Sequence, residues 1–403
     1  MDNRKIRGTR TERAKKVALV HDWLPLVGGA ERVLEQLMAI YPQADLFTLF
    51  DFLPRDQAPF LAGRNVYHSK LQNVPFSKKL YRHMLPLLPM AIEQFDLSGY
   101  DLVVSSSSAV AKGVITSPDQ LHVCYCHSPM RYAWDLQSQY LTQTGLNRGI
   151  KSTLVRYVLY RMRLWDVVSS NRVDSYFANS GYIRNRIHKT YRREASVIYP
   201  PVDINRFTVR HEKSDFYLAA SRQVPYKRID LIASAFRSMP DKKLVIIGDG
   251  PEHKKIKALA GPNIEILGYQ PDTVLQDYIG RAKAFIFAAQ EDFGILPVEA
   301  QACGTPVIAF GRGGARETVL DRITGLLFEE QTEESLIDAV ARFERLHKNF
   351  RADVIRQHAS NFSIEKFRVE IERHVDALLR DQAKTAVQPK PPKGVEHMRK
   401  FQQ

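Results

Sequence analysis

Short apolar runs alternate with helix-length segments along almost the whole chain, and they do so in two successive series. In the first series the runs are Val17–His21, Leu46–Leu49, Leu102–Ser105, His122–Cys126, Asp174–Asn179 and Ser196–Tyr199. In the second series they are Phe216–Ala219, Leu244–Ile247, Ile264–Leu267, Ala284–Phe287 and Val307–Ala309. Strands that alternate with helices favour parallel sheets. The pattern therefore predicts an α/β fold with two doubly wound, Rossmann-like domains and a ligand cleft between them.

The chain has 403 residues, more than one ordinary core accommodates. Two prolines and a polar stretch interrupt the alternation at Pro200–Ser214, which we interpret as the interdomain linker. A last helical pattern, Ile364–Leu379, is expected to pack back on the N-terminal domain. The predicted units are a disordered basic lead-in 1–16, an acceptor-side domain 17–205, a nucleotide-binding domain 215–362, a returning helix 364–380 and a disordered tail 382–403.

Composition and charge limit the cellular setting and the binding partners that fit this chain. No apolar run reaches the length of about 18 residues that a membrane span needs, and the basic first residues do not form a secretory signal. Three cysteines without framework spacing fit a reducing, cytoplasmic setting. The formal charge of +14 calls for an anionic partner: nucleic acid, an anionic membrane face or phosphorylated substrates.

The basic residues gather in two stretches without acids, both in the N-terminal half. Residues 57–92 carry Arg64, Lys70, Lys78, Lys79 and Arg82, and residues 136–165 carry Arg148, Lys151, Arg156, Arg161 and Arg163. In the second stretch Leu154, Val158, Met162 and Trp165 stand at helical spacing. An amphipathic helix of this kind fits an anionic membrane surface. Equally, the apolar stripe could face the core while the arginines are merely solvated.

The sharpest motif is the segment 291–299, Glu-Asp-Phe-Gly-Ile-Leu-Pro-Val-Glu. Glu291 ends a strand-to-helix loop, Gly294 permits close approach of backbone to a ligand, and Glu299 lies inside the following helix. Free amides at the start of that helix can bind a diphosphate. A carboxylate further in can accept two hydrogen bonds from a ribose diol.

Two cations follow the first strand of the second series. Arg222 and Lys227 come at and just beyond its carboxyl end, where a guanidinium and an ammonium suit a pyrophosphate. No Asp-x-Asp dyad for Mg²⁺ occurs in the chain. We therefore expect a metal-independent site in which these cations neutralise the phosphates, with no cofactor.

A glycine pair opens the first helix. Gly28 and Gly29 follow the strand Val17–His21 and allow close backbone approach, although many α/β domains carry such a turn for packing alone. The turn has no Gly-x-Gly-x-x-Gly, which counts against a dinucleotide cofactor.

Together these motifs resemble the GT-B glycosyltransferases of family 4, a retaining group, from Val17 to about Leu379. Glu291 and Glu299 match the family's paired glutamates, Arg222 and Lys227 its basic pair, and Gly28 and Gly29 its N-terminal glycine loop. The resemblance implies that Glu299 binds the donor ribose and Glu291 the hydroxyls of the donor sugar. It further implies that the diphosphate contacts the amides around Gly294, Ile295 and Leu296, and that Gly268 and Tyr269 border the nucleobase.

The segment 124–135, Cys-Tyr-Cys-His-Ser-Pro-Met-Arg-Tyr-Ala-Trp-Asp, resembles the WbaZ-like mannosyltransferases of the same family. By that resemblance His127 contacts the donor sugar near the reacting carbon. Arg131, Trp134 and Asp135 either shape the acceptor end of the cleft or serve the fold alone.

Two local alternatives stay open. Cys124, Cys126 and His127 could suggest a metal site, but strand alternation separates the cysteines from the histidine and no second pair completes a tetrahedron. We expect buried strand cysteines and no bound metal. The turn 311–314, Gly-Arg-Gly-Gly, is either a further cleft-facing turn or a plain loop.

The resulting hypothesis is a retaining hexosyltransferase that moves mannose from GDP-mannose to a lipid-linked glycan in surface polysaccharide synthesis. It would be cytoplasmic and peripheral on the inner face of the cell membrane. UDP sugars are the alternative donors. A nucleotide-sugar epimerase of the same fold is the alternative enzyme. Nucleic-acid binding, motivated by the pI of about 9.6, lacks any recognisable reader motif.

Overall fold

The N-terminal domain is built on a seven-stranded sheet. The computed structural model describes residues 16–386. The strands are β1 Val17–His21, β2 Asp45–Thr48, β3 Val66–His68, β4 Leu102–Ser107, β5 Leu121–Cys126, β6 Ser175–Ala178 and β7 Ala195–Val197. They are ordered β3-β2-β1-β4-β5-β6-β7, and every pair is parallel.

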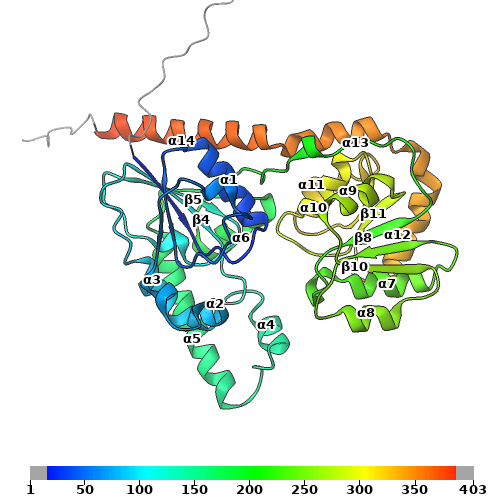
Figure 1. Cartoon of the computed structure of the whole chain (residues 1–403), viewed down its shortest axis with the longest axis horizontal. Coiled ribbons are helices and arrows are strands. Elements are labelled where there is room, and N and C mark those ends of the chain that lie inside the picture. The colour runs from blue at the N-terminus through cyan, green and yellow to red at the C-terminus, as the bar shows by residue number, and fades with distance from the viewer. Residues whose placement is uncertain (1–15, 387–403) are drawn as a thin grey trace, which may run out of the picture.

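The C-terminal domain repeats this topology with six parallel strands in the order β10-β9-β8-β11-β12-β13. They are β8 Tyr217–Ala220, β9 Leu244–Ile247, β10 Ile264–Gly268, β11 Ala284–Phe287, β12 Val307–Phe310 and β13 Gly325–Phe328. The predicted fold of two doubly wound, Rossmann-like domains is confirmed (Figure 1).

Helices cover both sheets. In the first domain they are α1 Gly29–Ile40, α2 Ser77–Leu80, α3 Leu88–Ile92, α4 Gln137–Gln143, α5 Gly149–Ser170 and α6 Gly181–Tyr191. In the second they are α7 Ile229–Arg237, α8 His253–Leu259, α9 Asp272–Arg281, α10 Ile295–Ala302, α11 Ala315–Thr318, α12 Glu333–Leu346 and α13 Ala352–Ala359. The 3₁₀ turns are η1 Pro59–Leu61, η2 Lys70–Asn73, η3 Tyr81–Leu87, η4 Ala111–Gly113, η5 Ile204–Arg206, η6 Pro225–Lys227, η7 His347–Asn349 and η8 Ser360–Phe362.

The last helix, α14 Ile364–Ala386, returns from the C-terminal domain and runs along the N-terminal one (Figure 1). Phe367, Ile371 and Val375 are buried in the same core as α1 and β1, and Arg368 donates to Gln36 of α1. The helix runs past residue 382, so the prediction of a disordered tail from 382 is wrong for 382–386. The lead-in 1–15 and the tail 387–403 lie outside the described residues.

Strand order reverses at one place in each sheet, between β1 and β4 and between β8 and β11. Ligands of doubly wound sheets bind beyond the carboxyl ends of the strands at such switch points. The loops after β1, β4, β8 and β11 are therefore the first place to look for a site.

Candidate active site

The two domains meet through the first turns of two helices. A Cβ built on Gly29, in α1, would stand 3.0 Å from the Ile295 Cδ1 atom in α10. That separation is tighter than ordinary van der Waals contact, so the Ile295 side chain would have to shift by a few tenths of an ångström to admit a side chain at position 29. Gly29, one of the two glycines singled out from the sequence, thus lies at a contact between α1 and α10.

A second interdomain contact is polar. Glu317 of α11 accepts hydrogen bonds from the backbone N–H groups of Gly181 (2.7 Å) and Tyr182 (2.9 Å), at the start of α6. The hydroxyl of Tyr199 donates to the same carboxylate at 3.2 Å. A carboxylate at a helix N-terminus is favoured by the helix dipole. This contact stabilises the present position of the two domains relative to each other, and so the present width of the cleft.

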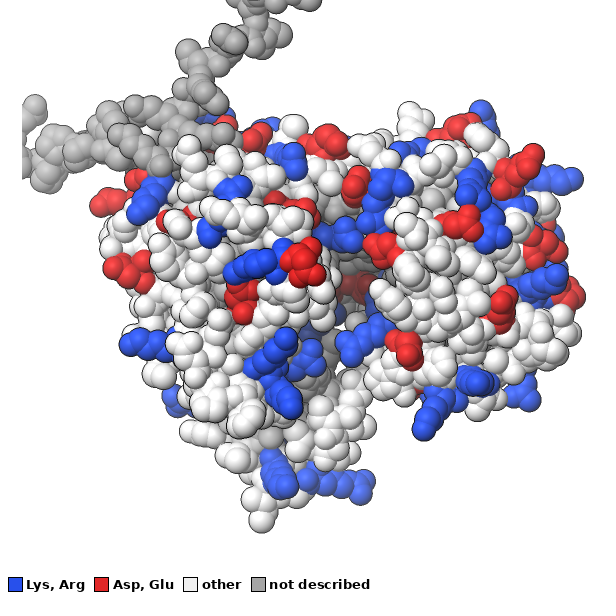
Figure 2. All heavy atoms as spheres, viewed as in Figure 1, with Lys and Arg blue, Asp and Glu red and all other residues white. Residues whose placement is uncertain are grey.

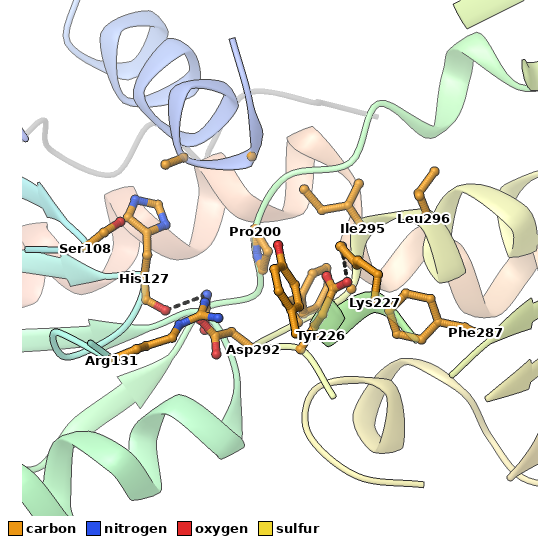
Figure 3. A pocket seen from close by; sticks show the side chains of 16 residues that line it. Ser108, His127, Arg131, Pro200, Tyr226, Lys227, Phe287, Asp292, Ile295 and Leu296 are labelled. Atoms are coloured by element: carbon orange, nitrogen blue, oxygen red, sulfur yellow. Dashed lines mark hydrogen bonds and ion pairs between the residues drawn. The ribbon is translucent and has the colours of Figure 1, made fainter. Parts of the chain in front are cut away.

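Between the domains lies a cavity of about 390 Å³ (Figures 2 and 3). Both helix starts and the ends of several strands contribute to its wall. The lining side chains used below are those of His127, Arg131, Tyr226, Lys227, Glu291, Asp292, Ile295 and Leu296.

On the N-terminal side, Asp22 holds the loop that follows β4. Its carboxylate is buried and accepts four backbone hydrogen bonds, from Ser108, Ala109, Val110 and Ala111, at 2.5–2.9 Å. One side chain at the end of β1 thereby fixes the loop after β4, across the switch point. We did not assign Asp22 a role from sequence, although a carboxylate directly after a buried strand was a usable signal.

His127, at the end of β5, belongs to a chain of hydrogen bonds. Its Nε2 lies 2.8 Å from Oγ of Ser106, and the same hydroxyl lies 3.1 Å from Nδ1 of His21. Burial, followed by the nearby His21 and Arg131, lowers the pKa of His127 to about 3. The imidazole is therefore neutral at ordinary pH, and its Nδ1 makes no hydrogen bond within residues 16–386. A neutral ring in the cavity wall can exchange a hydrogen bond with a sugar hydroxyl.

On the C-terminal side, Lys227 of η6 forms an ion pair with Glu291 in the loop after β11. Both side chains are largely buried and line the cavity (Figure 3). The structure thus brings together a lysine and a glutamate that lie 64 positions apart in the sequence.

The start of α10 is open toward the same cavity. Gly294 precedes the helix with φ of 86°, a conformation that favours glycine, and no side chain caps the helix. The first N–H groups of a helix have no partner within it. The amides of Ile295 and Leu296 are therefore available beside Lys227.

The turn 311–314 supports the Glu291 loop from behind. A Cβ on Gly313 would lie 2.3 Å from the carbonyl oxygen of Glu291, and one on Gly314 would lie 2.2 Å from Cα of Phe293. The amide of Gly314 donates to the carbonyl of Glu291 at 2.8 Å. These glycines serve the cleft by letting two loops pack backbone against backbone.

A second network crosses the cleft beside the first. Asp292 pairs with Arg131 and, at 3.6 Å, with Arg186 of α6, which also pairs with Asp135. Burial raises the pKa of Asp292 to about 6, against the lowering influence of both arginines. Asp292 and Arg186 were not singled out from sequence, because their proximity depends on how the two domains dock.

A larger cavity of about 570 Å³ adjoins this network and shares Arg131, Tyr226 and Asp292 with the first. Its wall is rich in tyrosine and glutamine: Tyr132, Tyr140, Tyr182, Tyr226, Gln139, Gln143, Gln290 and Gln331. Aromatic faces and amide groups together suit a carbohydrate, which has both apolar C–H faces and hydroxyls.

The other candidates lie around or away from these cavities. Arg222 is exposed on the loop after β8, and its guanidinium has no partner within the described part of the chain. Glu299 is buried in α10 with Arg206 at 3.7 Å, and burial raises the pKa of its carboxyl. Gly268 and Tyr269 lie at the carboxyl end of β10, with Tyr269 exposed.

Trp134 does not face either cavity. Its indole N–H donates to Asp166 at 2.7 Å, and Asp166 is a fully buried carboxylate that also pairs with Lys112. Of the two roles considered for Trp134, these contacts favour service to the fold, because they hold the N-terminal core together. Arg131 and Asp135 do line the larger cavity.

Cys124 and Cys126 are buried in a small core beside β6. Between residues 16 and 386, no three His, Cys, Asp or Glu side chains are grouped so that they could hold a metal ion.

Comparison with known proteins gives two family matches. Residues 27–206 match the model described as Glycosyltransferase Family 4, and residues 202–360 match that of Glycosyl transferases group 1. One model thus falls on each domain.

Two curated relatives match part of this chain. An uncharacterized glycosyltransferase of Methanocaldococcus jannaschii is 30% identical over 202 residues, which is 48% of this chain and 56% of that protein. The GDP-mannose-dependent alpha-(1-6)-phosphatidylinositol monomannoside mannosyltransferase of Mycobacterium tuberculosis is 31% identical over 193 residues, 40% of this chain and 50% of that protein. The match therefore spans about half the length of these relatives.

Among solved structures, that of Anabaena Alr3699/HepE in complex with UDP covers 90% of this chain and all of its own, with a TM-score of 0.66 and 18% identity. At that identity the likeness establishes the fold.

Proposed function

We propose that this chain, a member of the GT-B glycosyltransferases of family 4 by the match of both its domains, transfers a hexose from a nucleotide-diphosphate sugar to a glycan acceptor. The observation that supports this most is the seat at the smaller cavity, which consists of Lys227, Glu291 and the uncapped start of α10.

The seat fits a leaving diphosphate. Negative charge grows on the diphosphate as the glycosidic bond breaks, and groups placed where charge develops lower the barrier. In our proposal Lys227 and the amides of Ile295 and Leu296 bind that diphosphate. The exposed Arg222 closes on it from the loop after β8. These groups take over the charge neutralisation that a metal would provide, so the reaction needs no Mg²⁺.

The remaining donor contacts follow the family resemblance. Glu291 binds donor-sugar hydroxyls once the diphosphate has replaced it on Lys227. Glu299 binds the ribose, and Gly268 and Tyr269 border the base. His127 accepts or donates one hydrogen bond at the sugar as a neutral imidazole.

The proposed stereochemistry is retention through front-face attack. The N-terminal residues that line the smaller cavity include no carboxylate that could form a covalent intermediate. The leaving diphosphate then accepts the proton of the acceptor hydroxyl as the new bond forms, on the face that the diphosphate leaves.

We propose mannose from GDP-mannose as the donor, with UDP sugars as the alternative. The mycobacterial relative named GDP-mannose-dependent and the WbaZ-like segment 124–135 favour mannose. The acceptor, in our proposal a lipid-linked glycan at the inner membrane face, occupies the larger cavity beside Arg131 and Asp135.

The test is a transfer assay on the full chain with lipid-linked glycan extracts as acceptor. We expect radiolabel from GDP-mannose, in preference to UDP-glucose or UDP-galactose, to enter the lipid fraction at equal rates with Mg²⁺ and with EDTA. Conversion of the nucleotide sugar in the absence of acceptor would indicate an epimerase instead. Activity abolished by EDTA would contradict the metal-free seat.

A further inference from the structure

Helix α5 is apolar on two sides. Of the stripe noted in the sequence, Met162 is buried, and Val158 and Trp165 pack partly buried against the N-terminal core. Leu154 does not belong to that stripe, because it is 63% exposed. The inward stripe accordingly accounts for the fold and says nothing about a membrane.

The outer face of α5 carries a second stripe that sequence reasoning missed. Its members recur at helical spacing and all are exposed: Ile150, Leu154, Tyr157, Tyr160, Leu164, Val167 and Val168. Ile150, at the start of the helix, is 90% exposed. A helix that is apolar on its solvent side has an unpartnered surface.

The segment from η2 to α3 extends this surface. Its exposed apolar side chains are Val74, Phe76, Leu80, Leu87 and Met90. Buried members of the segment, Tyr81 and Leu88, pack in the same core as Leu159 and Met162 of α5, and Glu93 accepts from the indole of Trp165 at 2.8 Å. The two elements therefore lie next to each other, at the lower end of the domain in Figure 1.

Phe76 is presented outward in an unusual way. Its φ is 61°, in the left-handed region that bulky residues rarely adopt, and its side chain is 75% exposed. Its carbonyl accepts from the backbone amides of Lys79 and Leu80 at 2.9 and 3.0 Å, while its ring is left largely unpacked. The conformation leaves an aromatic ring exposed on the segment, where it can enter an apolar medium.

The charged residues of the two stretches that form most of this surface have one sign. Lys70, Lys78, Lys79 and Arg82 accompany the segment, and Arg148, Lys151, Arg156 and Arg161 accompany α5, while residues 57–92 and 136–165 contain no acid. Figure 2 shows basic residues and no acidic ones on the visible lower part of this domain. An apolar face with a basic border is complementary to an anionic lipid surface.

We propose that the outer face of α5 and the segment 74–90 form a docking surface for an anionic phospholipid bilayer. Phe76, Ile150 and Leu154 enter the interface and the lysines contact phosphate headgroups. The described helices include none long and apolar enough to cross a membrane, so the contact lies along the surface. The inference rests on the proposed function in one respect: a lipid-linked acceptor would be embedded in the bilayer to which this surface docks.

The test is co-sedimentation of the full chain with two kinds of vesicle. One is phosphatidylcholine alone, and the other contains about 30% phosphatidylglycerol to supply the negative surface potential of an anionic leaflet. We expect binding to the anionic vesicles only. Lys78→Gln and Lys79→Gln should each lower the partition coefficient about fivefold. The triple variant Phe76→Ser, Ile150→Ser, Leu154→Ser should lower it about tenfold or more.

Matched variants separate the surface from general charge and hydrophobicity. Lys254→Gln with Lys257→Gln, exposed on α8, and Ile323→Ser with Val369→Ser, which are 51% and 59% exposed, should bind as the wild type does. Docking-surface variants that bind like the wild type would overturn the proposal. The proposal would also be overturned if the wild-type chain did not bind vesicles but formed a concentration-dependent dimer that the triple variant does not form. The assay uses no donor or acceptor, so failure of the transferase proposal would leave its result intact.

Discussion

Replacing Lys227 by alanine should reduce the rate of sugar transfer by about 10²-fold or more, with both domains still folded. Lys227 lines the cavity onto which the start of α10 opens, and its ammonium pairs with Glu291. Its loss removes positive charge at the point where we place the leaving diphosphate. It also leaves the carboxylate of Glu291 uncompensated in the cavity, which repels a diphosphate.

The measurement is the initial rate at saturating donor together with kcat/KM. A transition-state contact lowers both by similar factors, whereas a purely ground-state contact raises KM alone. Lys254→Ala, on the surface of the same domain, is the charge-matched control. The double variant with Glu291→Ala should not recover activity, since Glu291 has its own proposed contact with the donor sugar. Near-normal turnover in Lys227→Ala would remove the main support for the proposed reaction.

Asp22→Ala should destabilise the N-terminal domain by about 3 kcal/mol or more. Its carboxylate accepts from four consecutive backbone amides, and each buried amide left without a partner costs about 1–3 kcal/mol. Water can replace some of these bonds, so the full sum is not expected. Against a typical total stability of about 5–15 kcal/mol the loss is large.

Tryptophan fluorescence during urea unfolding measures this effect on the right domain, because Trp23, Trp134 and Trp165 all lie in the N-terminal domain. Asp22→Asn, which keeps an acceptor oxygen, should fall between wild type and Asp22→Ala. Asp56→Ala, at an exposed site in the same domain, should leave the midpoint unchanged. An unchanged midpoint in Asp22→Ala would show that the loop after β4 is held by other contacts.

The sequence predicted the fold well where strands are buried, because a buried parallel strand must be a short apolar run. Two strands were not predicted from the sequence. Val66–His68 is a three-residue edge strand whose Tyr67 and His68 are exposed, so it lacks the apolar signature. Gly325–Phe328 begins with a glycine, which reads as a turn, although a Cβ there would collide with the backbone of Val307 at 1.9 Å.

The site was predictable where one loop carries the chemistry. The segment 291–299 holds its glutamates, glycine and helix start within nine positions, so their arrangement follows from local structure. The partners of that loop were not predictable in the same way. Arg131 and Arg186 reach Asp292 only because the domains dock, and Trp134 turns inward because a buried carboxylate 32 positions later needs a donor.

In helix α5, periodicity correctly indicated an amphipathic helix, but the stripe it identified is the one that packs on the core. The spacing of Val158, Met162 and Trp165 indicated an amphipathic helix, and those residues are the ones that pack on the core. The exposed stripe has the same period on the other side, and only burial distinguishes the two. A helix with apolar residues on both sides needs a structure before either face can be assigned.

A crystal structure of the full chain with GDP tests the central claim, the diphosphate seat, most directly. We expect β-phosphate oxygens within about 2.7–3.2 Å of the amides of Ile295 and Leu296 and of Nζ of Lys227, with Glu291 released from that lysine. A nucleotide bound with its phosphates away from the start of α10, and with the Lys227–Glu291 pair intact, would contradict it.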